Sequence, residues 1–315
     1  MSDTGSDYRA WLRPEVLARI GGLELRARMV VEGYYTGMHR SPYRGASVEY
    51  ADHRAYTQGD DLRHIDWKVY GRTDKYYIKE YEQETNLDCV LVVDTSESMG
   101  YRSAGAPLSK HEYATVIAAS LAYLALNKQR DSVGLALFDE RIRRYVRPSR
   151  SPARWKAVIR ELQGGLGPAK TGIRQVLNDL AERLDHRVLI IVISDFLDHL
   201  EEVLQGLAHL RFRRHEIIAC CVWDDAEHDF PFTGPTLFDG LEGAGRLLTE
   251  PRALRDRYLE EVRRFNQRLR DGCHRLRVDH VSFRTSAPLG VAISAYLATR
   301  SARIRLRSSR VLGGG

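Results

Sequence analysis

The sequence predicts an α/β fold, with a mostly parallel sheet flanked by helices. From Leu87 onward, short apolar runs alternate with longer segments whose apolar residues recur at helical spacing. Each run is continuously apolar, which is typical of parallel strands covered by helices on both faces. With 315 residues and 43% hydrophobic content, the chain is large enough for one such domain with an elaboration, or for two smaller domains.

Residues 1–86 are predicted to form an N-terminal helix and a β-rich appendage. Apolar side chains recur three and four residues apart from Pro14 to Gly37, and a proline suits the first turn of a helix. Strand-like pieces follow at residues 47–56 and 75–84, with a polar loop between them.

Residues 87–302 are predicted to form the main domain, and residues 303–315 a basic tail. Buried strands are expected at residues 89–94, 131–139, 187–196 and 215–225, with an antiparallel edge strand in the stretch IRRYVRPS. Helices are expected at residues 110–130, 152–165, 172–184, 200–214 and 251–276. A hairpin is expected to turn at residues 242–245, and a last strand and helix close the pattern.

Composition narrows the classes of protein to consider. The formal net charge is +6, but basic and acidic residues are interspersed, which does not favour a nucleic-acid partner. No apolar run is long enough to span a bilayer, and the N-terminus lacks the apolar core of a signal peptide. The four cysteines show no metal-ligand spacing and are expected to be free thiols in a reducing compartment. We therefore expect a cytoplasmic protein with no membrane span.

Oxygen-bearing side chains follow the predicted strands at the points where these strands end. The run CVLVV leads into Asp94, Ser96 and Ser98, the most apolar run leads into Asp195, and Thr171 lies where a loop enters a helix. Because ligands gather at the carboxyl ends of strands in such sheets, we expect these segments to converge. The set contains no His or Cys, and oxygen ligands favour Mg²⁺, with Mn²⁺ or Ca²⁺ as alternatives.

Other interpretations of these residues stay open. Ser98 could begin the next helix as a cap, and Thr171 could cap the helix that follows it. A nucleophilic role for Ser96 or Ser98 would need a neighbouring base, and neither lies in a G-x-S-x-G context. The sequence contains no G-x-x-x-x-G-K-[ST] motif, which excludes a P-loop.

The D-x-S-x-S run, the distant Thr and the distant Asp together resemble the metal-ion-dependent adhesion site (MIDAS) of the von Willebrand factor A domain, a Rossmann-like fold. The resemblance implies a metal site formed by Asp94, Ser96, Ser98, Thr171 and Asp195. It further implies that the hydroxyls lie close to the ion, that the aspartates often act through water, and that one position stays open for an acidic group on a partner protein. The KTG context of Thr171 departs from the usual Thr-Asp pairing of that family.

A second resemblance concerns the segment YTQGDDLRHIDWKVYGRTDKYYIKEYEQE, residues 56–84. It is similar to the signature of the bacterial domain-of-unknown-function family 58, whose members join such a segment to a von Willebrand factor A-like domain. The resemblance covers roughly residues 14–300. In that family the gene often neighbours a MoxR-type AAA+ ATPase, which implies an adaptor or co-chaperone that acts with the ATPase on a client protein.

The block from Gly59 to Arg72 offers a second candidate site. Asp61, Arg63, Asp66 and Trp67 could form an interaction surface with the tryptophan as its anchor. They could equally form an internal ion-pair network that locks the appendage to the main domain.

Two functions are consistent with the predicted metal site. The first is a non-enzymatic, Mg²⁺-dependent protein-interaction module whose ion completes its shell with a partner carboxylate. The alternative is a Mg²⁺-dependent hydrolase that uses the ion as a Lewis acid, with Glu97 or Asp195 as the general base.

Overall fold

The computed structural model describes residues 12–40, 53–56, 67–79, 87–167, 169–240 and 245–299, which fall into two compact units. The larger unit holds the described residues up to Met38 and from Leu87 onward, and the smaller unit lies within His39–Asn86. All the predicted metal ligands belong to the larger unit.

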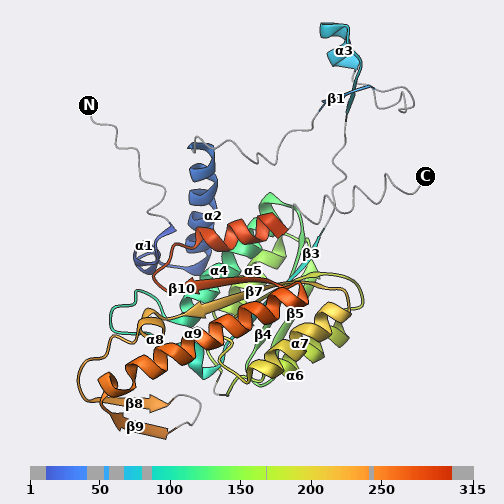
Figure 1. Cartoon of the computed structure of the whole chain (residues 1–315). Helices are drawn as coiled ribbons and strands as arrows, with labels where there is room; N and C mark the ends of the chain where they lie inside the picture. The colour runs from blue at the N-terminus through green and yellow to red at the C-terminus, as the bar shows by residue number, and fades with distance from the viewer. Residues whose placement is uncertain are drawn as a thin grey trace, which may run out of the picture. The chain divides into compact units, whose positions relative to one another are not determined.

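The larger unit is built on a six-stranded sheet with the strand order β10-β7-β6-β3-β4-β5 (Figure 1). Its strands are β3 (Asp88–Asp94), β4 (Ser132–Phe138), β5 (Ile142–Ser149), β6 (Leu189–Ser194), β7 (Glu216–Trp223) and β10 (Asp279–Arg284). All neighbours run parallel except β5, which pairs antiparallel with β4. The predicted mostly parallel α/β fold is confirmed, and so is the antiparallel edge strand.

The strand order places a switch point between β3 and β6. The chain continues from β3 to β4 on one side of the sheet and from β6 to β7 on the other. In open sheets wound in this order, ligands bind outside the carboxyl ends of the two central strands. Asp94 ends β3 and Ser194 ends β6, so both residues lie at the ligand-binding position of the fold.

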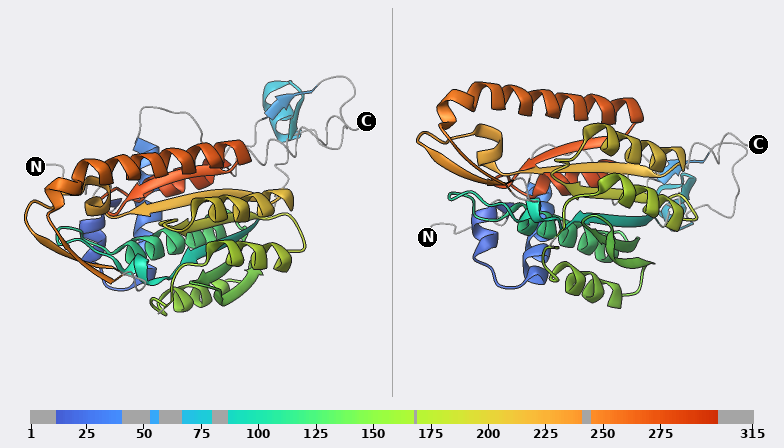
Figure 2. Two further views of the ribbon diagram at one scale, coloured as in Figure 1. Left: turned by 60° about the horizontal axis from the view of Figure 1, so that its bottom comes forward. Right: turned by 90° about the horizontal axis from the view of Figure 1, so that it is seen from below.

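Helices cover both faces of the sheet (Figures 1 and 2). The helices that follow β3 are α4 (Lys110–Tyr123), α5 (Ala153–Leu162), α6 (Ile173–Arg183), α7 (Leu200–Phe212), the short α8 (Asp225–Asp229) and α9 (Pro251–Leu276). Leu91 and Val93 of β3 pack in the apolar cluster that contains α4 and α5, whereas Val90 and Val92 pack in the cluster of α6, α7 and α9. This burial of alternate residues on opposite faces explains why the strand is continuously apolar.

The N-terminal helix predicted from Pro14 to Gly37 is interrupted. The structure has α1 (Pro14–Ala18) and α2 (Leu23–Arg40), with Gly22 between them at a φ of 80°. Glycine adopts positive φ without steric cost, so the turn at this residue redirects the chain where apolar spacing alone predicts one helix.

Helix α2 packs within the larger unit. Its buried residues Leu23, Ala27 and Val30 fall in the same apolar cluster as Leu91. The predicted division after residue 86 placed this helix with the appendage, whereas its apolar residues join the cluster that contains α4 and α5.

Within the smaller unit, β1 (His53–Ala55) pairs antiparallel with β2 (Tyr77–Lys79). Helix α3 (Trp67–Thr73) lies between them in sequence, where a polar loop was predicted. The stacked rings of Tyr70 and Tyr76, with centroids 4.6 Å apart, connect this helix to the residues that lead into β2. Such a contact leaves no trace in apolar periodicity, which is why the sequence pattern missed the helix.

The elements after β7 follow the predicted order. Strands β8 (Thr236–Gly240) and β9 (Gly245–Thr249) form the hairpin, and α9 has the predicted bounds. Within the described ranges, the structure contains no helix with both the length and the apolar character needed to cross a membrane.

Candidate metal site

Asp94 lies at the centre of the candidate site and has no exposed surface. The Ser194 hydroxyl donates to its Oδ2 at 2.5 Å, and the main-chain N–H of Ser96 donates to its Oδ1 at 2.9 Å. Burial and the charge of Asp195 outweigh these bonds and raise the pKa of Asp94 to about 7. The position therefore holds a carboxylate whose charge is only partly compensated.

The hydroxyls of Ser96 and Ser98 lie beside this carboxylate. Their Oγ atoms are 3.1 Å apart, and the side chain of Ser96 also hydrogen-bonds Asp94. Ser96 stands before the short 3₁₀ helix Glu97–Gly100, but its side chain makes no capping bond. The D-x-S-x-S run thus gathers one carboxylate and two hydroxyls. The next α-helix, α4, has Ser109 as its N-cap, so Ser98 does not cap it.

Asp195, the residue after β6, is engaged by a buried lysine. The Nζ of Lys110 lies 2.8 Å from Asp195 Oδ2 and 2.6 Å from Glu227 Oε1. Burial alone would lower the pKa of Lys110, but the two carboxylates raise it above its ordinary value, so the amine stays charged. Asp195 therefore has a cation within the chain, in contrast to Asp94.

Neither Lys110 nor Glu227 was predicted from the sequence as part of this site. One local signal points to the lysine: it is the first residue of α4, immediately after the N-cap Ser109. A cation in the first turn opposes the helix dipole and is favourable only where a carboxylate meets it. Which carboxylate meets it depends on tertiary structure.

Thr171 lies on the loop before α6, which is tied to the D-x-S-x-S run by main-chain hydrogen bonds. Gly167 N–H donates to the carbonyl of Thr95 at 2.6 Å, and Glu97 N–H donates to the carbonyl of Ala169 at 3.3 Å. The N-cap of α6 is the glycine after Thr171, so the threonine is not the capping residue. The loop places Thr171 close in sequence to residues that contact the run, and its role as a metal ligand stays a prediction.

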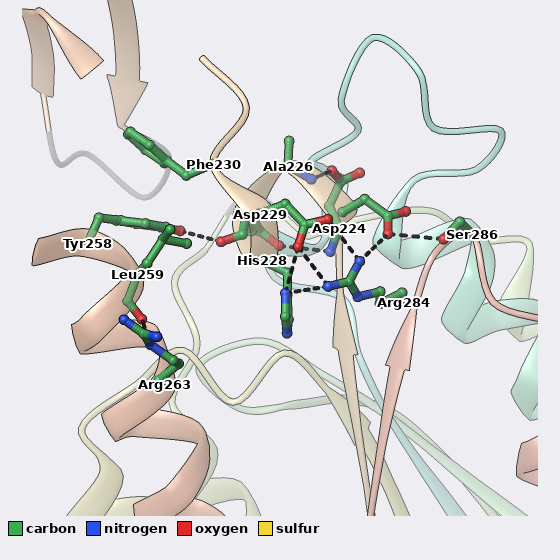
Figure 3. Close-up of polar contacts among 12 residues, drawn as sticks. Asp224, Ala226, His228, Asp229, Phe230, Tyr258, Leu259, Arg263, Arg284 and Ser286 are labelled. Carbon is green, nitrogen blue, oxygen red and sulfur yellow. Dashed lines mark hydrogen bonds and ion pairs between the residues drawn. The ribbon is translucent and has the colours of Figure 1, made fainter. Parts of the chain in front are cut away.

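Helix α8 carries Glu227 and is anchored by a polar cluster, in which Arg284 faces the acids of the helix (Figure 3). Arg284 donates to both carboxylate oxygens of Asp229, at 2.7 and 2.8 Å, and to Asp225 at 3.3 Å. The hydroxyl of Tyr258 donates to the main-chain carbonyl of Glu227 at 2.8 Å. These contacts fix α8 so that its glutamate side chain reaches the buried lysine.

The second candidate set is only partly described. Trp67 lies on α3 with 62% of its surface exposed and contacts Tyr70 edge to face, with centroids 6.1 Å apart. Asp61, Arg63 and Asp66 lie outside the described residues, so the interaction surface stays a prediction.

The donor set around Asp94 consists of oxygens. In the part of the chain that the structure describes, no three His, Cys, Asp or Glu side chains form a group suited to a metal ion. A site here would depend on hydroxyls together with Asp94 and Asp195. A partly compensated buried carboxylate beside two hydroxyls fits a hard divalent cation such as Mg²⁺, which would supply the missing positive charge.

A mostly parallel sheet that carries this oxygen cluster at its switch point defines a von Willebrand factor A-like protein, as the sequence predicted. The family model described as "Protein of unknown function DUF58" matches residues 52–268, well over half of the chain. The chain belongs to this family.

The chain is also similar to individual proteins and to solved structures. Uncharacterized proteins of Mycobacterium tuberculosis and Mycobacterium bovis are each 27% identical over 253 residues, covering 77% of this chain and 76% of theirs. Among solved structures, the conserved hypothetical protein BatB from Bacteroides thetaiotaomicron matches with a TM-score of 0.46 and 16% identity, over 69% of this chain and 100% of that one. The SpRpn10 VWA domain matches with a TM-score of 0.35 and 12% identity, over 66% of this chain and 94% of that one.

Proposed function

We propose that this chain is a non-enzymatic, Mg²⁺-dependent protein-interaction module. Asp94, Ser96, Ser98, Thr171 and Asp195 would hold the ion, with one position left for a carboxylate of a partner protein. The ion would supply positive charge where these side chains offer only oxygens, so an acidic group would be attracted only when the ion is bound. Mn²⁺ or Ca²⁺ could use the same oxygens.

The observation that carries this proposal is the buried carboxylate of Asp94. It ends a central strand at the ligand-binding position of the fold and lies beside the hydroxyls of Ser96 and Ser98. Because its pKa is raised to about 7, ionising it without a cation costs free energy in the folded state. A bound divalent ion would offset that cost.

The alternative, a Mg²⁺-dependent hydrolase, gains no support from this arrangement. Asp195 is bound to the ammonium of Lys110, so the carboxylate oxygen that faces this lysine is already engaged. Glu97 lies on the 3₁₀ helix and its side chain is exposed, whereas Asp94 and Ser96 are buried. Neither acid is placed as a general base for a reaction at the ion, so we favour binding over catalysis.

We further propose that the module works with a MoxR-type AAA+ ATPase as an adaptor or co-chaperone. The support is the resemblance of residues 56–84 to the family signature, which implies such a partner. The sequence has no P-loop motif, so the second chain would supply ATP hydrolysis.

The test is capture of a purified MoxR-type ATPase, and of partners identified from the native cell, in Mg²⁺ and in EDTA. Capture should be lost in EDTA and in the Asp94→Ala plus Ser96→Ala variant, while circular dichroism shows a retained fold. A matched control, Ser151→Ala plus Asp256→Ala, removes a hydroxyl and a carboxylate from exposed positions and should capture normally. Equal capture by every protein in both conditions contradicts metal dependence.

A further inference from the structure

Arginines crowd the start of the edge strand β5. Arg141 precedes the strand, and Arg143 and Arg144 lie in its first half. Together with Ile142 they line a hollow of about 390 Å³. Among the described strands β5 pairs only with β4, so no strand covers its outer edge there. We refer to Arg141, Arg143 and Arg144 as the arginine rim.

The arginine rim is continuous with the candidate metal site. Arg143 Nη1 lies 3.4 Å from the hydroxyl of Thr95, the residue between Asp94 and Ser96. A Cβ atom added at Gly167 would lie 2.8 Å from the same guanidinium nitrogen, so Arg143 also passes close to the loop before α6. Two of the three segments that carry predicted metal ligands, the D-x-S-x-S run and the loop before α6, therefore border this arginine.

The charge of the arginine rim is incompletely neutralised. Arg143 Nε lies 3.4 Å from Asp139, and Arg144 Nε lies 3.6 Å from Glu161 with 71% of its own side chain exposed. Arg141 forms no ion pair with any residue that the structure describes. Residues 139–147 hold four arginines and two acids, so positive charge remains for a ligand. The Arg144–Glu161 pair is long and its arginine is exposed. Surface pairs of this kind contribute little free energy, so Arg144 remains available to a new carboxylate.

We propose that the arginine rim docks an acidic segment of the partner protein whose carboxylate completes the metal shell. This inference rests on the proposed metal-dependent function. One carboxylate of the segment binds the ion, and acidic side chains a few residues further along pair with Arg141 and Arg144. The partner is thereby defined as a segment with at least two carboxylates rather than one isolated acidic residue.

Two features favour a protein segment over a nucleic acid. The proposed ion site has one position for a partner carboxylate. Tyr145, the aromatic residue of β5, is half-buried with Arg183 5.7 Å from its ring centroid, so it offers no free platform for base stacking.

The test is fluorescence anisotropy with a labelled peptide of alternating glutamate and glycine, in Mg²⁺ and in EDTA. Arg141→Ser plus Arg144→Ser should weaken binding in Mg²⁺ by roughly 3- to 20-fold, the effect of two exposed charge contacts. Electron paramagnetic resonance should show unchanged Mn²⁺ affinity in this variant, because neither arginine is a predicted metal ligand. Arg252→Ser plus Arg257→Ser, which removes the same charge from exposed positions on α9, should leave peptide affinity unchanged.

The outcomes separate this inference from the function on which it rests. Peptide binding that is lost in EDTA but unchanged in the Arg141/Arg144 variant overturns the docking role of the arginine rim. The metal-dependent function would still stand. Binding that needs both arginines but survives EDTA overturns the metal-dependent function and supports the rim as an acidic dock. An oligonucleotide that binds more tightly than the peptide and depends on the same arginines overturns the assignment of a protein partner.

Discussion

Lys110 and Asp195 form a buried ion pair at the carboxyl edge of the sheet, with 2.8 Å between Nζ and Oδ2 and at most 1% of either side chain exposed. The pair joins the first turn of α4 to the end of β6, and Glu227 adds a second carboxylate from α8. Three elements distant in sequence thus meet at one ammonium group. On the neighbouring strand β3, Asp94 accepts hydrogen bonds from Ser194 and Ser96 in place of such an ion pair.

Lys110→Met should destabilise the fold strongly. It leaves Asp195 and Glu227 buried without their cation, and breaking a buried pair in this way typically costs about 3–5 kcal/mol. Urea unfolding followed by circular dichroism measures the loss. The control is Arg264→Met, whose partners Glu260 and Glu261 are exposed and whose loss should be below about 1 kcal/mol. Equal losses of unfolding free energy in the two variants would show that the ion pairs of Lys110 do not stabilise the fold more than surface pairs do.

The sheet could be predicted from sequence because its cause is local. Each central strand is buried on both faces, so a run such as LIIVIS in β6 must be continuously apolar, and this pattern is visible in the chain itself. The D-x-S-x-S part of the site is local for the same reason, since Asp94, Ser96 and Ser98 contact one another within five residues.

The rest of the site depends on contacts that no local pattern encodes. Lys110 and Asp195 are separated by 85 residues, and Lys110 and Glu227 by 117. Their meeting requires the strand order that places the ends of β6 and β7 next to the start of α4, and a parallel sheet can be wound in several orders. The sequence therefore predicted the acids of the central strands but not the lysine that pairs with one of them.

Gly172→Ala should destabilise the protein and disturb the loop that carries Thr171. A Cβ at this position would lie 2.8 Å from the carbonyl oxygen of Glu140, and main chain cannot move aside as a side-chain end can. Overpacking of this kind typically costs about 1–3 kcal/mol. Thermal unfolding should show a clear loss for this variant and little for Gly105→Ala, where the added Cβ meets open space. Similar losses at both positions would mean that close packing at Gly172 is not the cause.

His186 should make part of the stability dependent on pH. Its Nδ1 lies 2.6 Å from Asp185 and its Nε2 2.5 Å from Asp88, and these hydrogen bonds raise the pKa of His186. A raised folded-state pKa means that protonated histidine stabilises the fold. The contribution is complete below the unfolded pKa of about 6.5 and is lost as the pH rises through the higher folded value.

His186→Gln removes this contribution, so melting temperatures of wild type and variant should differ in acid and converge in alkali. The difference should be small and should shrink in high salt, because the ring is half exposed and solvent screens the pair. A difference that stays constant across the pH range would exclude titration of His186 as its source.

Asp94→Asn should separate the stability of the fold from the binding of the ion. The amide keeps the shape of the side chain: its oxygen can still accept from Ser96 N–H, and its NH₂ can donate to the Ser194 hydroxyl. It removes the charge whose burial raises the pKa of Asp94 to about 7, so in EDTA near about pH 8 the variant should be more stable by about 1–3 kcal/mol. Added Mg²⁺ should stabilise the wild type by mass action and leave the variant unchanged, which thermal unfolding can measure directly. Two results would contradict the proposal that the charge of Asp94 binds a cation. One is a variant that is less stable than the wild type in EDTA, and the other is a variant that Mg²⁺ stabilises as much as it stabilises the wild type.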